Sequence, residues 1–194
     1  MPYIAKEIMQ KKGIPEDIIG QFDFPNRASK GAKLSEEIIA VINQMDRLLP
    51  LEQRLSIMED TGCCTQGKPA AAHRAFGRRH AGKSIEEKVR LYGEAGKADL
   101  RTPHKPPCRL NLDGTLSVFW SFGEEGDYRC VCGHIHDLPQ PAEVSPTFCG
   151  CCGGHSRKLL QRSLGVKLRL KEIVSSAASS KGKKGCEFTF DIVN

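Results

Sequence analysis

The sequence predicts an α+β fold, in which N-terminal helices pack on a C-terminal antiparallel sheet that contains an inserted helix. Two observations predict it. Across residues 34–95 the apolar side chains recur at helical spacing. In residues 110–194, which are rich in cysteine, the apolar period falls to two, as in half-buried strands, and one helical segment interrupts the strands. We expect residues 1–33 to form an N-terminal arm and residues 34–194 to form a single domain.

The helical half divides at its glycines and prolines. Ser35 is expected to cap a first helix that reaches Pro50, and Gly62 to end a second one. A third helix is expected over residues 68–80. In the fourth, Ser84 and Glu87 form a capping box and Gly93 marks the end.

The sheet half begins with a hairpin signal. An Asp113-Gly114 step separates two short alternating segments, as in a tight turn between strands. "YRCVCGHIH" (residues 128–136) also alternates and is expected to be a strand, with three ligand-type side chains on one face. A helix is expected over "SRKLLQRSL", ended by Gly165, followed by two final strands over residues 166–174 and 186–193.

Composition narrows the functional classes. The net charge is +6, but the basic residues form short separate patches such as "FGRRHAGK", which suit solvated surface better than a phosphate-binding face. Only 6% of residues are aromatic, so nucleic-acid binding is not favoured. The sequence has no apolar run of membrane-spanning length and no secretory signal, so we expect a cytoplasmic protein without a membrane partner. The oligomeric state is not predicted.

Nine cysteines are the strongest chemical signal. Several are adjacent or one residue apart, a spacing that suits metal binding or thiol chemistry better than disulfides. Cys130-x-Cys132 and Cys149-x-x-Cys152 resemble the two ligand pairs of a zinc ribbon, and glycines around the second pair would let the backbone fold tightly around an ion. These four cysteines are the predicted zinc ligands. Possible substitutes are Cys63, Cys151, His134 and His155.

A thiol nucleophile is the alternative. The cysteines at 149–152 precede or open a helix, whose N-terminus can lower a thiol pKa. Cys151 with His155 as base is the candidate catalytic pair. The other histidines, at positions 73, 80 and 104, are expected to be surface or hydrogen-bonded residues.

The last quarter of the chain carries a family resemblance. Gly165, the strand over residues 166–174, Gly185 and "CEFTF" from Cys186 resemble the ending of the 4-vinyl reductase domain, a small-molecule sensor module. They also resemble the L-2-amino-thiazoline-4-carboxylic acid hydrolase family. The resemblance implies a sensor fold and, by analogy, Cys186 beside a metal cluster.

Three functions remain open from the sequence. The first is a zinc-binding sensor or accessory domain with a small-molecule ligand. The second is a hydrolase of cyclic amide-like or thiazoline substrates, which would use a cysteine thiolate or a metal-bound water. The third is a zinc-ribbon-like nucleic-acid binder, supported by the basic charge and opposed by the scattered patches.

Overall fold

The structure is a computed structural model that describes residues 2–26, 28–62, 67–98, 106–135, 138 and 144–193. Its elements follow one another along the chain in two runs. The first run is helical: α1 (Pro2–Lys11), α2 (Glu16–Ile19), α3 (Gly31–Leu48), α4 (Leu51–Asp60), α5 (Gly67–Arg79) and α6 (Ile85–Ala98). The second run contains the strands and one helix: β1 (Cys108–Leu110), β2 (Leu116–Trp120), β3 (Gly123–Glu124), β4 (Asp127–Tyr128), a 3-10 turn η1 (Pro146–Cys149), α7 (Gly150–Leu164), β5 (Lys167–Ser175) and β6 (Cys186–Val193). The α+β prediction is confirmed.

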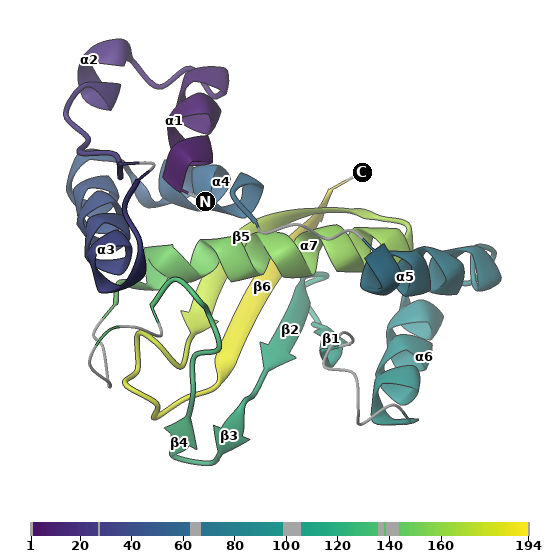
Figure 1. The fold of residues 1–194 in the computed structure, drawn as a ribbon. Helices are drawn as coiled ribbons and strands as arrows, with labels where there is room; N and C mark the ends of the chain where they lie inside the picture. The colour runs from purple at the N-terminus through teal and green to yellow at the C-terminus, as the bar shows by residue number, and fades with distance from the viewer. Residues whose placement is uncertain are drawn as a thin grey trace.

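The main sheet has four antiparallel strands in the order β1-β2-β6-β5. The last strand in sequence, β6, lies between β2 and β5, because the chain leaves the sheet after β2 and returns through α7 and β5. That excursion begins with the β3-β4 hairpin. Figure 1 shows α7 lying across the strands, with the hairpin projecting beyond the end of β2.

One face of the sheet forms the core with α7. Strand alternation turns the apolar side chains of β2, β5 and β6 to this face, and α7 supplies leucines from its own apolar side. The fully or almost fully buried members of this layer are Leu116, Val118, Leu160, Leu164, Leu168, Leu170, Phe188 and Phe190.

The opposite face of the sheet carries charge. Arg169 Nη2 lies 3.0 Å from Asp191 Oδ2 across β5 and β6, and Arg109 contacts Glu187 at 3.9 Å. Such exposed cross-strand pairs contribute little free energy each. They nevertheless distinguish the outer face from the apolar inner face, so α7 can pack on only one side.

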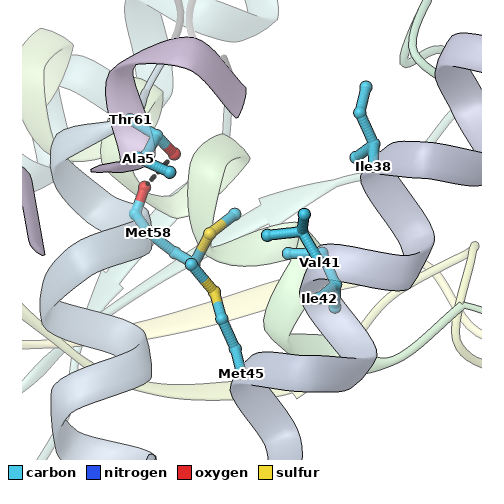
Figure 2. Close-up of a pocket in the computed structure, with 7 residues that line it drawn as sticks. All are labelled: Ala5, Ile38, Val41, Ile42, Met45, Met58 and Thr61. Carbon is cyan, nitrogen blue, oxygen red and sulfur yellow. Dashed lines mark hydrogen bonds between the residues drawn. The ribbon is translucent and has the colours of Figure 1, made fainter. Parts of the chain in front are cut away.

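The N-terminal helices form a second layer that closes over α4. Figure 2 shows side chains of α1, α3 and α4 meeting around a gap of about 20 Å³. The gap is lined by Ala5, Ile38, Val41, Ile42, Met45, Met58 and Thr61. Thr61 Oγ1 donates to the Met58 carbonyl (2.7 Å), so its hydroxyl proton is already used within the helix end. This gap is a packing defect of the size of a single water molecule.

Helix α4 approaches α7 unusually closely, because glycines of α7 face it. An ideal Cβ built on Gly154 would lie 1.9 Å from the Glu59 carbonyl oxygen, and one on Gly150 would lie 2.6 Å from Met58 Cβ. Gly153 points to the sheet instead, where a Cβ would lie 2.9 Å from a Leu170 methyl. The glycines therefore allow α7 to fit between α4 and the sheet.

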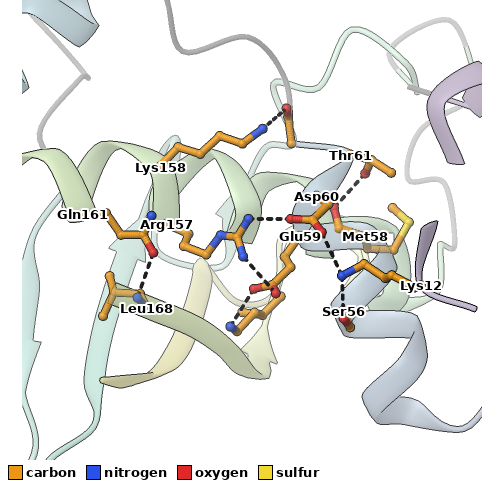
Figure 3. Close-up of polar contacts among 12 residues, drawn as sticks. Lys12, Ser56, Met58, Glu59, Asp60, Thr61, Arg157, Lys158, Gln161 and Leu168 are labelled. Atoms are coloured by element: carbon orange, nitrogen blue, oxygen red, sulfur yellow. Dashed lines mark hydrogen bonds and ion pairs between the residues drawn. The ribbon is translucent and has the colours of Figure 1, made fainter. Parts of the chain in front are cut away.

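A polar network joins this close contact to the rest of the fold (Figure 3). Glu59, whose side chain is 6% exposed, pairs with Arg157 Nη1 (2.9 Å) and accepts a hydrogen bond from Leu170 N (2.8 Å). Arg157 also reaches Asp60 (2.6 Å), and Lys12, which directly follows α1, reaches Asp60 as well (2.8 Å). The network thus connects α1, α4, α7 and β5.

Helices α5 and α6 pack at the C-terminal end of α7 (Figure 1). His73 of α5 is fully buried and its Nδ1 lies 2.8 Å from Ser163 Oγ, so it is a hydrogen-bonded core residue as expected. The His80 ring contacts the Phe76 ring at a tilted angle of 54°, while His104 lies outside the described residues.

Four local predictions need correction. Ser35 does not cap α3, which begins at Gly31; Ser35 is buried inside the helix and bonds back to the Gly31 carbonyl. Helix α6 continues past Gly93 to Ala98. Helix α7 begins at Gly150, not near Ser156, so the cysteine-rich stretch is helical. The segment expected as a strand over residues 128–136 pairs only at its first residue and then turns, within the part that the structure describes.

Other local predictions are confirmed. Gly114 turns the chain at φ +80° between β1 and β2, and Gly165 ends α7 at φ +72°. Ser84 Oγ accepts the Glu87 N–H at the start of α6, which is half of the expected capping box. Across the residues that the structure describes, the helices are all too short or too polar to cross a membrane.

Candidate functional site: a thiol-lined pocket

A pocket lies on the core face of the sheet, beyond the N-terminal end of α7. In the β2–β6 ladder, Val118 pairs with Phe188, and the next inward-facing pair is Trp120 with Cys186. The first turn of α7 does not cover this last pair completely. A hollow therefore forms where the strands reach past the helix.

The hollow has a volume of about 320 Å³ and a mostly apolar surface. Residues from four parts of the chain line it: Trp120, Phe122, Arg129, Cys130, Val131, Cys132, Gly133, His134, Cys151, Cys152, His155, Cys186 and Phe188. Its size falls at the lower end of small-molecule sites, which are typically apolar with a few polar groups.

Aromatic rings form one wall. The Trp120 and Phe122 rings stack with centroids 5.9 Å apart, and the His155 ring lies 6.3 Å from Trp120. The indole N–H of Trp120 donates to Ser156 Oγ (2.8 Å), and that hydroxyl donates to the Cys152 carbonyl (3.0 Å). The indole is therefore fixed against α7, and its flat face is available to the pocket.

The opposite wall is the segment over residues 129–135. It folds back because the Arg129 N–H bonds to the Phe122 carbonyl (2.7 Å) and the Tyr128 N–H to the Gly182 carbonyl (2.9 Å). A turn follows, with Ile135 N bonded to the Cys132 carbonyl (3.1 Å). Ile135 is 1% exposed and anchors the turn in the core. The segment thus closes the pocket as a pinned loop.

Four thiols at or beside the pocket, those of Cys130, Cys149, Cys152 and Cys186, have a raised pKa, which favours their neutral form. Burial raises the pKa of Cys130 and of Cys186 above the ordinary value. The pKa of Cys152 is lowered by its hydrogen bond with Cys151, but burial and nearby sulfur atoms raise it by more, so the net pKa is above the ordinary value. The buried Cys149 thiol also has a strongly raised pKa, mainly through burial and partly through its proximity to Cys186, Cys130 and Cys132. The seven described cysteines are all free thiols.

The structure brings most of the predicted ligands to one region. Cys130, Cys132 and Cys152 line the pocket, and Cys149 lies buried close by. The substitutes Cys151, His134 and His155 also line it, while Cys63 lies outside the described residues, as do Cys64 and His136.

The zinc prediction is nevertheless wrong. Within the described ranges, no group of three or more His, Cys, Asp or Glu side chains is placed to hold a metal ion. The physical reason is the helix: the glycines expected to wrap an ion instead pack α7 against α4 and the sheet. The cysteines between them are therefore spread along a rigid helix and line a cavity.

The hydrolase expectation is also corrected. In one form it depended on a thiolate made by the N-terminus of a helix, and in the other on a metal-bound water, for which the described residues offer no group of ligands. Cys149 and Cys151 do lie at the start of α7, but both are buried. Burial strongly raises the pKa of Cys149, and the pKa of Cys152 is raised despite its hydrogen bond with Cys151, which disfavours the thiolate that nucleophilic catalysis needs. The candidate pair Cys151 and His155 both line the pocket.

Sequence reasoning missed the aromatic wall. Trp120 and Phe122 are two residues apart, so strand alternation places both on one side, and Trp120 is the chain's single tryptophan. This spacing could have predicted the aromatic wall. Arg129 and the inward pairing of Cys186 with Trp120 depend on strand register and loop folding, for which local sequence gives little information.

Comparisons with known proteins do not support the family resemblance. No family model matches this chain, and no curated protein matches it. The expected relation to the 4-vinyl reductase domain and the thiazoline hydrolase family is therefore wrong. Among solved structures, the crystal structure of an H-NOX protein from S. oneidensis in the Fe(II)NO ligation state covers 100% of both chains, at 10% identity and a TM-score of 0.35.

Proposed function

We propose that this chain is a sensor-type binding domain for a small, flat and largely apolar molecule, and that the thiol-lined pocket is its binding site. The observation that carries the proposal is the pocket itself: about 320 Å³ of mostly apolar space between stacked rings and a pinned loop. Stacking on Trp120 and Phe122 favours a ligand with one or two planar rings.

The chemistry of the lining favours binding over catalysis. Neutral thiols act as small polarizable apolar groups and weak hydrogen-bond donors. Arg129, His134 and His155 are the polar groups at the pocket. They can orient one acceptor or one weakly acidic group of the ligand. Burial lowers the pKa of His134, so its ring is neutral near neutral pH.

The location of the pocket supports a sensing role. A ligand there would contact the first turn of α7 and the loop over residues 129–135 at the same time. Helix α7 is the element that packs against α4, α5, α6 and β5. A ligand that favours one position of α7 would change the packing of both helical groups.

The single tryptophan gives a direct test. Naphthalen-2-ol and naphthalene-2-carboxylate, a neutral and an anionic bicyclic probe, are titrated into the full chain while Trp120 emission is recorded. We expect saturable quenching by at least one probe. The preference between them reports whether the polar groups favour a neutral or a charged ligand.

A pocket-filling variant gives the matched comparison. Gly133 lines the pocket, and a Cβ on it would meet no atom within 4 Å, so we expect Gly133→Phe to be tolerated by the fold and to reduce the space in the pocket. Gly82→Phe, also in open space but outside the pocket, is the control. Quenching should disappear in the first variant and persist in the second. Quenching that is unchanged by Gly133→Phe, or absent with both probes, would refute the proposal.

A further inference from the structure

A second cleft lies at the other end of α7, ten residues and about 15 Å along the helix from Cys152. It has a volume of about 490 Å³ and is formed where α5 and the start of α6 meet the C-terminus of α7. Its lining residues are Arg74, Gly77, Arg78, Ala81, Lys88, Arg162 and Gly165. Four of these seven are cations and none is an acid.

The positive charge of this cleft is not balanced within α5. Arg74 and Arg78 are one helical turn apart, and like charges at this spacing destabilise a helix. The sequence of α5 contains no Asp or Glu. Among the described residues, both guanidinium groups are exposed, and no ion pair or hydrogen bond is formed by their side chains.

The fold holds the cations of three helices near one another. Gly77, between the two arginines of α5, lets the helix approach α7 so closely that a Cβ there would lie 2.2 Å from the Arg162 carbonyl oxygen. Lys88 Nζ of α6 donates to the Leu164 carbonyl (2.9 Å) beside Gly165. The lysine is therefore fixed at the edge of the cleft.

Helix stabilisation accounts for only part of this charge. Arg78 and Arg162 lie in the last turns of α5 and α7, where basic side chains favourably oppose the negative end of the helix dipole. Two helix ends carry about half a negative charge each. Because Arg74 and Arg78 alone carry two positive charges, an excess of positive charge remains at the cleft.

We propose that this cleft is a binding site for a polyphosphate group carried by a small molecule. Guanidinium groups bind phosphate oxygens through paired, charge-assisted hydrogen bonds, and a lysine adds a point charge. A chain of two or three phosphates would reach from Arg74 and Arg78 to Lys88 and Arg162 and relieve the repulsion within α5.

The lining favours a compact polyanion over a nucleic-acid strand. The cleft presents no aromatic ring on which a base could stack, and stacking supplies much of single-strand affinity. The site is independent of the thiol-lined pocket, so either proposal can fail alone.

Calorimetric titration of the full chain with tripolyphosphate at low salt tests the site. Citrate, a carboxylate trianion, and a single-stranded oligothymidine are titrated in parallel. We expect tripolyphosphate to bind more tightly than either. Arg74→Gln with Arg78→Gln should weaken its binding at least about tenfold, because several charge-assisted hydrogen bonds are lost.

Arg90→Gln is the matched control, since Arg90 is an exposed arginine of α6 that pairs with Glu94 at 2.6 Å, outside the cleft. Its effect should stay within about twofold. Absence of tripolyphosphate binding, equal binding of citrate, or an equal loss in the control would overturn the proposal. Tighter binding of the oligothymidine, in competition with tripolyphosphate, would also overturn it and assign the cleft to nucleic acid.

Discussion

The two sides of the N-terminal half of α7 use small side chains in opposite ways. Toward α4, Gly150 and Gly154 remove every side-chain atom, so that helix and helix meet backbone to backbone. Toward the end of the sheet, Cys151 and Cys152 keep one sulfur each and border an open pocket. The comparison teaches that a glycine- and cysteine-rich stretch can encode close packing on one side of a helix and a cavity on the other.

The closed side tolerates no added volume, and Gly154→Val should have the largest effect. Its Cβ would overlap the Glu59 carbonyl oxygen, and neither backbone can move without separating α4 from α7. We expect a loss of at least about 3 kcal/mol in the free energy of unfolding, at the upper end of overpacking costs. Urea denaturation followed by circular dichroism measures it.

Gly133→Val, in the loop that faces the open side of α7 across the pocket, is the control. A Cβ there meets no atom within 4 Å, so the stability should change by less than about 0.5 kcal/mol. If the two variants lose the same stability, the two sides of α7 do not differ as described.

The closed side also contains the buried Glu59 carboxylate, and Glu59→Gln should have an intermediate effect. The amide can still accept the Leu170 N–H, but the charge opposite Arg157 is lost. We expect a cost of about 1–2 kcal/mol. Glu86→Gln, at an exposed position on α6, should cost less than about 0.5 kcal/mol.

The pH dependence of this cost has a definite sign. Burial raises the pKa of Glu59 above 4.5, despite the lowering effects of Leu170 N–H and Arg157. The protonated form is therefore favoured by folding, and its contribution is present below the unfolded-state pKa and lost as the pH rises through the folded-state pKa. Glutamine does not titrate, so the cost of the variant should be larger at about pH 4 than at about pH 7. A cost that grows with pH would mean that the Arg157 pair outweighs burial.

These two sides also explain what could be predicted from sequence. Strands β1, β2, β5 and β6, helices α3, α4 and α5, and the C-terminal part of α7 follow from apolar periodicity, because burying one face fixes which residues alternate. The sequence also indicated several cysteines that the structure brings to one region. The sequence did not indicate whether these cysteines bind a metal or line a cavity. The neighbouring Gly150, Gly153 and Gly154 are equally suited to a metal-binding loop and to a close helix contact. Only α4, distant in sequence, distinguishes the two.

The cavity could not be predicted from local sequence for a second reason. Its aromatic wall depends on the register that pairs Trp120 with Cys186, and its far wall depends on bonds from residues 128 and 129 to Gly182 and Phe122. Each of these contacts is set by the return of β6 between β2 and β5. Strand order is a property of the whole fold, and no short motif records it.

The open side should be distinguished by slow thiol chemistry, the smallest of the expected effects. Because burial raises the pKa of Cys186, and burial with nearby sulfurs raises that of Cys152, both are less ionised at pH 7.5 than ordinary cysteines. Iodoacetamide reacts with thiolates, so alkylation of these two residues should be slower in the folded chain than in the same chain unfolded in urea.

Peptide mass spectrometry measures each rate separately. In the folded chain the rate should keep rising with pH and level off at a higher pH than in urea, because a raised pKa shifts the pH profile. Restricted access of the reagent would lower the rate at every pH without shifting this profile. Equal profiles in the two states would show that these thiols are ordinary, and the pocket would then have to be regarded as a site for thiol chemistry.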